Sequence, residues 1–233
     1  MVKEIAIYLE GGGPNAETLT PFRQGMSTFL KPLVDAAREK RVRWKVIPCG
    51  GRAEALKAFK SALKTDPEVF NVLLVDAEEP VSDLTKPWDH LKARKGDEWV
   101  KPVKATNNHC HMMIVTMETW FLADAEALKN LFKNTNGFDA SAFPKMPADP
   151  APPKEGQQAP PPKASTFLES KSKTAVNAIL KKAFKGTAAK EYRKIDDGTR
   201  MLAVIDPEKV RKYCPSANRL FKTLGKMLGD ETL

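Results

Sequence analysis

Two stretches, IAIYLEGGG at residues 5–13 and VLLVDAEE at residues 72–79, decide the fold that we predict for this chain. Each begins with a short, continuous apolar run that is followed directly by an acidic residue. Such a run, bounded by turn residues, indicates a strand that is buried on both faces, as in a parallel sheet. Ligands of open α/β sheets bind just beyond the carboxyl ends of these strands. If the two strands are neighbours, Glu10, Asp76 and Glu78 converge at one edge of the sheet.

Carboxylates that converge in this way repel one another unless a cation joins them, and their oxygens are ligands that Mg²⁺ and Mn²⁺ prefer. We therefore expect Glu10, Asp76 and Glu78 to hold Mg²⁺ or Mn²⁺. Asp76 and Glu78 are two residues apart, so they point to the same side if the segment is extended. Glu118 follows a further predicted strand and is a fourth candidate ligand; stabilising the next helix by its charge is the alternative role.

The apolar periodicity predicts strands and helices in alternation. We expect strands at residues 3–9, 44–47, 70–76 and 111–117, and helices at 19–37, 52–63, 88–91 and 120–132. Strand–helix–strand order implies right-handed crossovers and a parallel sheet. The prediction for residues 1–143 is therefore an α/β core with a mainly parallel four-stranded sheet flanked by helices.

The remainder of the chain divides by composition. Residues 144–163 hold many of the 18 prolines, and because Pro disfavours helix we expect a loop or an extended linker there. Residues 164–233 are predicted to be helical, roughly over 167–183 and 207–228. This region holds 15 Lys and Arg against 8 Asp and Glu, in a chain of formal net charge +9. A basic region beside an acidic site favours a phosphate-backbone partner, although Lys on a solvated helix needs no ligand.

Composition also limits the class of protein. No apolar run approaches the roughly 20 residues that span a bilayer, so we predict no membrane contact. The three cysteines are scattered and none lies in a CxxC pair, which argues for a reducing compartment. The first residues lack a signal-peptide pattern, and we expect a cytoplasmic protein.

Three other motifs have competing interpretations. Residues 11–13 are glycines but lack the GxGxxG spacing and the P-loop Lys, so a tight turn is favoured over a nucleotide cradle. Gly50 and Gly51 form a turn or leave room for an anion that Arg52 contacts. His109 and His111 form an HxH pair without a convincing third ligand, so a structural role is favoured over zinc binding.

Five motifs together resemble one bacterial family, the domain of unknown function 4276. They are IYLEGGG, PCGGRAEALKAF, VLLVDAEEPV, METWFLAD and YCPSANRLFKTL. That family is similar to the Toprim domains of topoisomerases, primases and overcoming-lysogenisation-defect nucleases, so the resemblance implies a Toprim-like, Rossmann-like fold. It implies that Glu10 is a general acid/base or metal ligand and that Asp76 and Glu78 are the metal-binding acidic pair, with Glu78 at a position that usually holds Asp.

The resemblance also implies a partner, because the family is often encoded beside an AAA or ABC-type ATPase in antiviral-defence gene neighbourhoods. We therefore predict a Mg²⁺- or Mn²⁺-dependent nuclease that hydrolyses phosphodiester bonds, with DNA as the expected nucleic acid. Two ions about 4 Å apart would clamp the scissile phosphate. The catalytic residues would be Glu10, Asp76 and Glu78, with Glu118 as a further ligand. The predicted phosphate contacts are Arg52, Lys181, Lys182, Lys185, Lys190, Arg193 and Lys194.

Two alternatives stay open. The chain is a non-catalytic binding or regulatory subunit of such an ATPase, or it transfers phosphoryl groups to a small nucleotide. Tyr8, Tyr192 and Tyr213 do not resemble a topoisomerase nucleophile, so topoisomerase activity is not expected.

Overall fold

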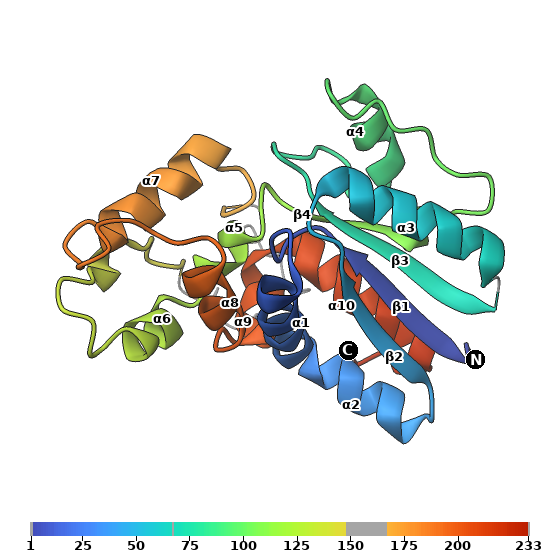
Figure 1. Cartoon of the computed structure of the whole chain (residues 1–233), viewed down its shortest axis with the longest axis horizontal. Helices are drawn as coiled ribbons and strands as arrows, with labels where there is room; N and C mark the ends of the chain where they lie inside the picture. The colour runs from blue at the N-terminus through green and yellow to red at the C-terminus, as the bar shows by residue number, and fades with distance from the viewer. Residues whose placement is uncertain (1, 67, 148–166, 233) are drawn as a thin grey trace, which may run out of the picture.

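The computed structural model, which describes residues 2–66, 68–147 and 167–232, contains a four-stranded parallel sheet with helices packed against it (Figure 1). The strands lie in the order β2–β1–β3–β4, with β1 at Glu4–Leu9, β2 at Arg43–Pro48, β3 at Val69–Asp76 and β4 at Cys110–Met113. The predicted α/β fold with a parallel sheet is therefore confirmed. Most of the proline-rich segment predicted at residues 144–163 lies outside the described residues.

The register of the sheet aligns the carboxyl ends of three strands. Leu9 of β1 is paired with Pro48 of β2 and with Leu74 of β3. The ladder continues past β1, since the Glu10 amide donates to the Leu74 carbonyl at 3.0 Å. Residues that follow β1, β2 and β3 are consequently brought to one edge of the sheet.

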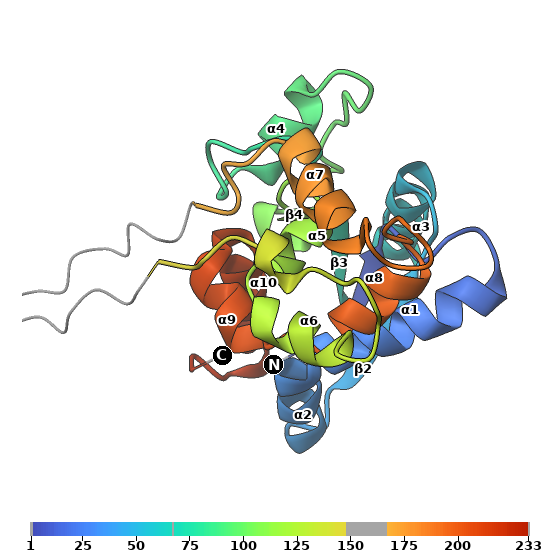
Figure 2. The same ribbon diagram turned by 90° about the vertical axis from the view of Figure 1, so that its left-hand side faces the viewer.

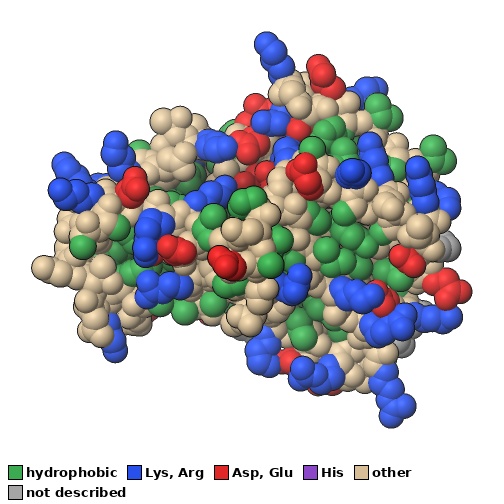
Figure 3. Space-filling view, in the orientation of Figure 1, with side chains coloured by type: hydrophobic (Ala, Val, Ile, Leu, Met, Phe, Trp, Pro, Cys, Tyr) green, Lys and Arg blue, Asp and Glu red, His purple; other side chains and the backbone are tan. Residues whose placement is uncertain are grey.

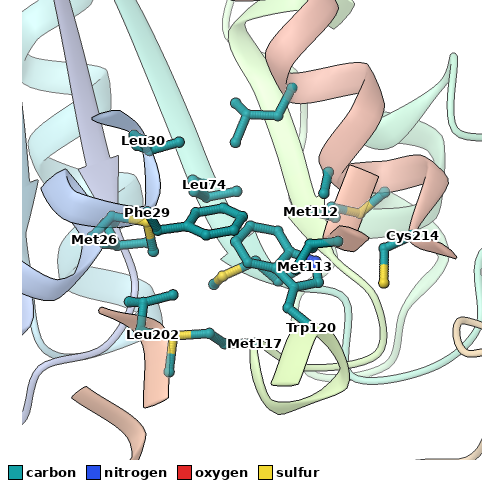
Figure 4. Close-up of a cluster of buried hydrophobic side chains, with 14 of the residues drawn as sticks. Met26, Phe29, Leu30, Leu74, Met112, Met113, Met117, Trp120, Leu202 and Cys214 are labelled. Carbon is teal, nitrogen blue, oxygen red and sulfur yellow. The ribbon is translucent and has the colours of Figure 1, made fainter. Parts of the chain in front are cut away.

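Helices cover both faces of the sheet. On one face lie α3 (Arg52–Thr65) and α4 (Pro87–Ala93), where the ring of Phe59 lies 6.4 Å from Tyr8 and 6.1 Å from Trp88. Successive strand residues point to opposite faces, and Leu74 lies in the cluster of the other face beside Phe29 (Figure 4). That face is covered by α1 (Ala16–Phe29), α2 (Lys31–Glu39) and α10 (Pro215–Leu228).

The C-terminal helices contribute to the same hydrophobic core. They are α7 (Lys173–Phe184), α8 (Asp196–Leu202), α9 (Pro207–Tyr213) and α10. Close packing of α8 on α1 requires a glycine, because a Cβ at Gly25 would lie 2.8 Å from the Thr199 carbonyl oxygen. Figure 2 views the molecule from the end at which α6 (Ala125–Leu131), α7 and α8 lie near the short helix α5 (Glu118–Phe121).

Three long predicted helices are divided in the structure, and a fourth begins later than predicted. The helix predicted at 19–37 is interrupted at Leu30, because Pro32 has no amide and its ring excludes a continuous helix. Asp124 separates α5 from α6, and its Oδ1 accepts the Ala127 amide at 3.3 Å. Pro215 begins α10 and separates it from α9, while α7 begins at Lys173 instead of 167. The sequence pattern did not predict α8.

The strand predicted at 111–117 is also shorter, since β4 ends at Met113. Side chains take the amides that a longer strand would use in the ladder. The Val115 amide donates to Oγ1 of Thr119 at 3.1 Å, and the Met117 amide donates to Oδ1 of Asp76 at 2.8 Å. The chain therefore turns after β4 and brings Met117 to the edge where the acids lie.

Two short 3-10 helices, Asn107–His109 and Ala140–Ala142, complete the secondary structure of the described residues. Within that part of the chain, no helix combines the length and the apolar character needed to cross a bilayer.

Candidate functional site

Glu10 and Asp76 meet at the carboxyl ends of the two central strands. Glu10 follows β1, Asp76 ends β3, and Oε2 of Glu10 accepts the main-chain amide of Asp76 at 3.1 Å. With Glu78 they form a group of three carboxylates, each with an oxygen within 4.8 Å of the others. The parallel register thus brings together three of the four residues that the sequence predicts as metal ligands.

Asp76 is the most buried member of this group, with 4% of the residue exposed. Burial raises its pKa well above the usual value, and the nearby carboxylates of Glu118 and Glu10 raise it further, against the opposing charge of Lys194. Because Oδ1 is fixed by the Met117 amide, Oδ2 is the oxygen that faces Lys194, at 3.8 Å. A cation at this position would offset both the cost of burying the Asp76 charge and its repulsion by the neighbouring carboxylates.

Glu78 reaches the group by a backbone turn. It has a positive φ of 70°, and its amide donates to the Val115 carbonyl at 2.6 Å, so the segment after Asp76 is not a regular extended strand. The predicted juxtaposition is nevertheless present. Its Oε2 pairs with the ammonium group of Lys173, the first residue of α7.

Glu118 lies beside the three carboxylates at the start of α5. Its side chain is 4% exposed and its Oε1 lies 3.6 Å from Lys194. The hydroxyl of Tyr192 donates to the same oxygen at 3.3 Å, and burial followed by the charge of Glu118 raises the tyrosine pKa well above its usual value. Glu118 therefore belongs to the site through the lysine that it shares with Asp76.

A cavity of about 300 Å³ opens next to these acids. Its lining combines polar groups with apolar walls, and it consists of Glu10, Gly11, Gly12, Gly13, Phe22, Gly50, Asp76, Met117, Lys194 and Ile195. Gly11, which follows β1, and Gly50, which follows β2, are joined by two main-chain hydrogen bonds of 2.8 and 3.1 Å. A Cβ at Gly50 would lie 2.8 Å from the Gly13 carbonyl oxygen, and φ there is +73°, so the turn requires glycine.

Arg52, predicted to contact phosphate, is placed against the acids. Its Nη1 donates to Oε2 of Glu10 at 3.0 Å and to the carbonyl oxygen of Asp76. Its Nε donates to Oδ1 of Asp97 at 2.7 Å. This role of Asp97 was not predicted from the sequence, because no local pattern links it to Arg52, which lies 45 residues earlier.

The other predicted phosphate contacts separate into two groups. Lys194 points to Asp76 and Glu118 and so belongs to the acidic site. The rest are exposed residues of α7 and the loop after it: Lys181, Lys182, Lys185, Lys190 and Arg193. Arg193 is paired with Asp197 at 2.9 Å. Lys and Arg gather at the end of the molecule that holds α7, and also at the opposite end (Figure 3).

The two histidines of the HxH pair, His109 and His111, have structural contacts. His111 is fully buried, with Nε2 3.1 Å from the Asn108 carbonyl oxygen and Nδ1 3.0 Å from Nη1 of Arg219. Burial and the Arg219 charge lower the pKa of His111 to about 3, so the ring stays neutral. Nδ1 of His109 accepts the Thr106 amide at 3.0 Å and its ring lies 4.7 Å from that of Phe70. These contacts favour the structural role.

Comparison with known proteins adds a family and no function. Neither a curated protein nor a solved structure gave a significant match. A family profile described as "Domain of unknown function (DUF4276)" matches residues 24–225. The match includes Asp76, Glu78 and Glu118, while Glu10 and the glycines after it precede the matched residues. The chain belongs to the DUF4276 family.

Proposed function

We propose that this protein is a Mg²⁺- or Mn²⁺-dependent nuclease that hydrolyses phosphodiester bonds. The observation that carries the proposal is the group formed by Glu10, Asp76 and Glu78 at the carboxyl edge of a parallel sheet, each with a carboxylate oxygen within 4.8 Å of the others. Ligands of open α/β sheets bind at this edge. Hard carboxylate oxygens in this number suit Mg²⁺ and Mn²⁺ better than softer metals.

The residues fit a divalent cation. Asp76 and Glu118 are nearly inaccessible acids, and burial followed by the charge of Glu118 raises the pKa of Asp76, so positive charge between them is favourable. Lys194 already supplies such charge, with its ammonium nitrogen within 3.8 Å of both carboxylates. Its side chain is 58% exposed, so the lysine can move into solvent when another cation replaces it.

When bound, Mg²⁺ or Mn²⁺ would supply a water of lowered pKa and positive charge beside the scissile phosphate. The protein orients the ligands. The Met117 amide holds Oδ1 of Asp76, which leaves Oδ2 toward the centre of the site, and Arg52 together with the Asp76 amide holds Oε2 of Glu10. Phe22, Met117 and Ile195 form apolar walls that limit water around the acids.

The proposed substrate is nucleic acid, with DNA as the first candidate. The exposed lysines of α7 and the loop after it would contact backbone phosphates without reading sequence. Phosphate contacts of this kind release counterions, so binding should weaken steeply as salt rises. A partner ATPase of the AAA or ABC type, as the family resemblance implies, would supply energy and further DNA contacts.

One observation favours the alternative, a non-catalytic binding or regulatory subunit of such an ATPase. Each of the three acids already has a basic partner: Lys173 for Glu78, Lys194 for Asp76 and Arg52 for Glu10. A site whose charge is compensated by the chain's own residues is stable without metal. In this alternative the acids serve structure, and the protein acts by docking.

The two candidates are separated by cleavage of supercoiled plasmid DNA with Mg²⁺ or Mn²⁺. Loss of a residue that hydrogen-bonds a metal ligand lowers metal affinity or activity about 10–100-fold. Asp76→Asn alters a proposed ligand itself, so its cleavage rate should fall at least about 100-fold. Asp89→Asn, which removes an exposed carboxylate on α4, should keep wild-type activity. Equal background nicking by wild type and Asp76→Asn would overturn the nuclease, and co-purification with an ATPase without Mn²⁺ binding would support the alternative.

A further inference from the structure

The guanidinium group of Arg52 is held from several sides beside the acidic site. Nε donates to Oδ1 of Asp97 at 2.7 Å and Nη2 donates to Oδ2 of the same carboxylate. Nη1 donates to Oε2 of Glu10 at 3.0 Å and to the Asp76 carbonyl oxygen. The ring of Trp99 lies 4.8 Å from Cζ, and the side chain is only 15% exposed. Most of its N–H groups are therefore committed to protein acceptors.

These contacts determine which oxygen of Glu10 remains available. Oε2 accepts from Arg52 and from the Asp76 amide at 3.1 Å. A carboxylate oxygen has two lone-pair directions, so these bonds occupy Oε2 and leave Oε1 as the ligand atom. Arg52 also joins the end of β1 to the end of β3, since it contacts both Glu10 and the Asp76 carbonyl.

Asp97 anchors the arginine from the opposite side. Its carboxylate is 2% exposed and is also bound by Nη1 of Arg94 at 2.9 Å. Burial favours a raised pKa for Asp97, but hydrogen bonds and charge from Arg52, with those from Arg94, outweigh burial and lower it. The loop after α4 is fixed as well, since the Trp99 amide donates to the Leu91 carbonyl at 3.1 Å. The carboxylate is therefore a rigid, charged support for Arg52.

We propose that Arg52 is a positioning residue of the metal site, supported by Asp97, and that it holds Glu10 with Oε1 toward the cation instead of contacting substrate phosphate. The inference rests on the proposed function and deepens it. A lysine cannot replace the arginine, because only the planar guanidinium fork binds Asp97 through two nitrogens while a third reaches Glu10. A phosphate would have to displace one of these buried acceptors.

Calorimetric titration of the full chain with Mn²⁺ tests the proposal, with DNA binding in EDTA measured on the same proteins. Arg52→Lys and Asp97→Asn should each weaken Mn²⁺ binding about tenfold, although Asp97 contacts none of the three acids directly. DNA affinity in EDTA and its salt dependence should stay unchanged in both variants. Asp89→Asn is the matched control and should bind Mn²⁺ like wild type.

The other outcomes are distinct. If Arg52→Lys weakens DNA binding and leaves Mn²⁺ affinity unchanged, Arg52 is a phosphate ligand and the proposal is wrong. If both variants lose thermal stability but bind Mn²⁺ within twofold of wild type below their melting temperatures, the role is structural only. If Glu10→Gln loses Mn²⁺ binding while Arg52→Lys and Asp97→Asn keep it, the metal site is supported and the positioning role of Arg52 is wrong. Equal Mn²⁺ binding by wild type and Glu10→Gln would overturn the metal site itself. Asp97→Asn, which keeps the size of the side chain, covers the case in which Arg52→Lys does not fold.

Discussion

Lys194 lies between two buried carboxylates, with its ammonium nitrogen 3.8 Å from Oδ2 of Asp76 and 3.6 Å from Oε1 of Glu118. The lysine side chain is 58% exposed, whereas those of the acids are 5% and 4% exposed. Partial burial lowers the pKa of Lys194, but Glu118 and Asp76 outweigh it and raise the pKa, so the ammonium form is kept. In the proposed metal site, a divalent cation bound to Asp76 would therefore compete with this lysine.

Removing this competitor should tighten metal binding. We expect Lys194→Met to bind Mn²⁺ about fivefold more tightly than wild type, which corresponds to ~1 kcal/mol, the upper end for a solvent-screened ion pair. Calorimetric titration measures the change, and Lys181→Met, an exposed lysine in the last turn of α7, is the control. Weaker Mn²⁺ binding by Lys194→Met would show that the lysine helps to build the site instead of competing for it.

Glu169 should make stability depend on pH. It is 7% exposed, and its Oε1 accepts the Ser216 amide at 3.0 Å in the first turn of α10. Burial raises its pKa to about 7, against the opposing hydrogen bonds from Ser216. A carboxyl pKa that is higher in the folded state stabilises the protein at low pH, and this contribution is lost as pH rises through about 7.

Glu169→Gln isolates that contribution, because the amide cannot ionise. Relative to wild type, the variant should gain about 3 kcal/mol in unfolding free energy between pH 4.5 and pH 8, from the difference between the usual and the folded pKa. Urea unfolding at several pH values gives the unfolding free energy of wild type and of the variant as a function of pH. A difference between variant and wild type that does not change with pH would contradict the prediction.

The glycine turn beside the acids should not tolerate a side chain. Gly50 has φ +73°, and an added Cβ would lie 2.8 Å from the Gly13 carbonyl oxygen, whereas Gly96 has φ +93° with nothing within 4 Å of its Cβ. We expect Gly96→Ala to lose about 1 kcal/mol from backbone strain alone and Gly50→Ala to lose about 2–3 kcal/mol. Thermal unfolding of the two variants separates strain from collision, and equal losses would mean that the turn relaxes freely.

The exposed lysines at the end of the molecule that holds α7 should determine the salt dependence of DNA binding. Exchange of three exposed lysines of α7 and its C-terminal end for Gln is expected to reduce the slope of log K against log salt by about 3. These lysines are Lys181, Lys182 and Lys185. The matched control exchanges three exposed lysines of α3: Lys57, Lys60 and Lys64. An equal loss from both triple variants would show that DNA binding depends on overall charge.

The sequence predicted the features that arise from local patterns. Apolar runs identified the strands, and the acids that follow them converge because parallel strands share a carboxyl edge. Breaks at Pro32 and Pro215 are visible in the sequence, yet apolar periodicity outweighed them in the prediction. The helix α8 has only seven residues, too few for a clear periodic pattern.

The sequence did not predict contacts between distant segments. Lys173 was not singled out, and Lys194 was predicted to contact phosphate, but the two lysines pair with Glu78 and Asp76. Asp97 lies in a polar loop that resembles any other such loop. These pairings depend on how the C-terminal helices pack against the sheet, and charge alone does not specify them.

The alignment of Glu10 with Asp76 also limits where the gene can gain or lose a codon. Leu9 and Leu74 are paired in the ladder. Glu10 is one residue beyond Leu9, and Asp76 is two residues beyond Leu74. One codon inserted within β3 would move Asp76 by about 3.3 Å and turn it to the opposite face of the sheet. Length variation among relatives should therefore fall in the surface loops, and the segments at residues 4–13 and 69–78 should keep a constant length.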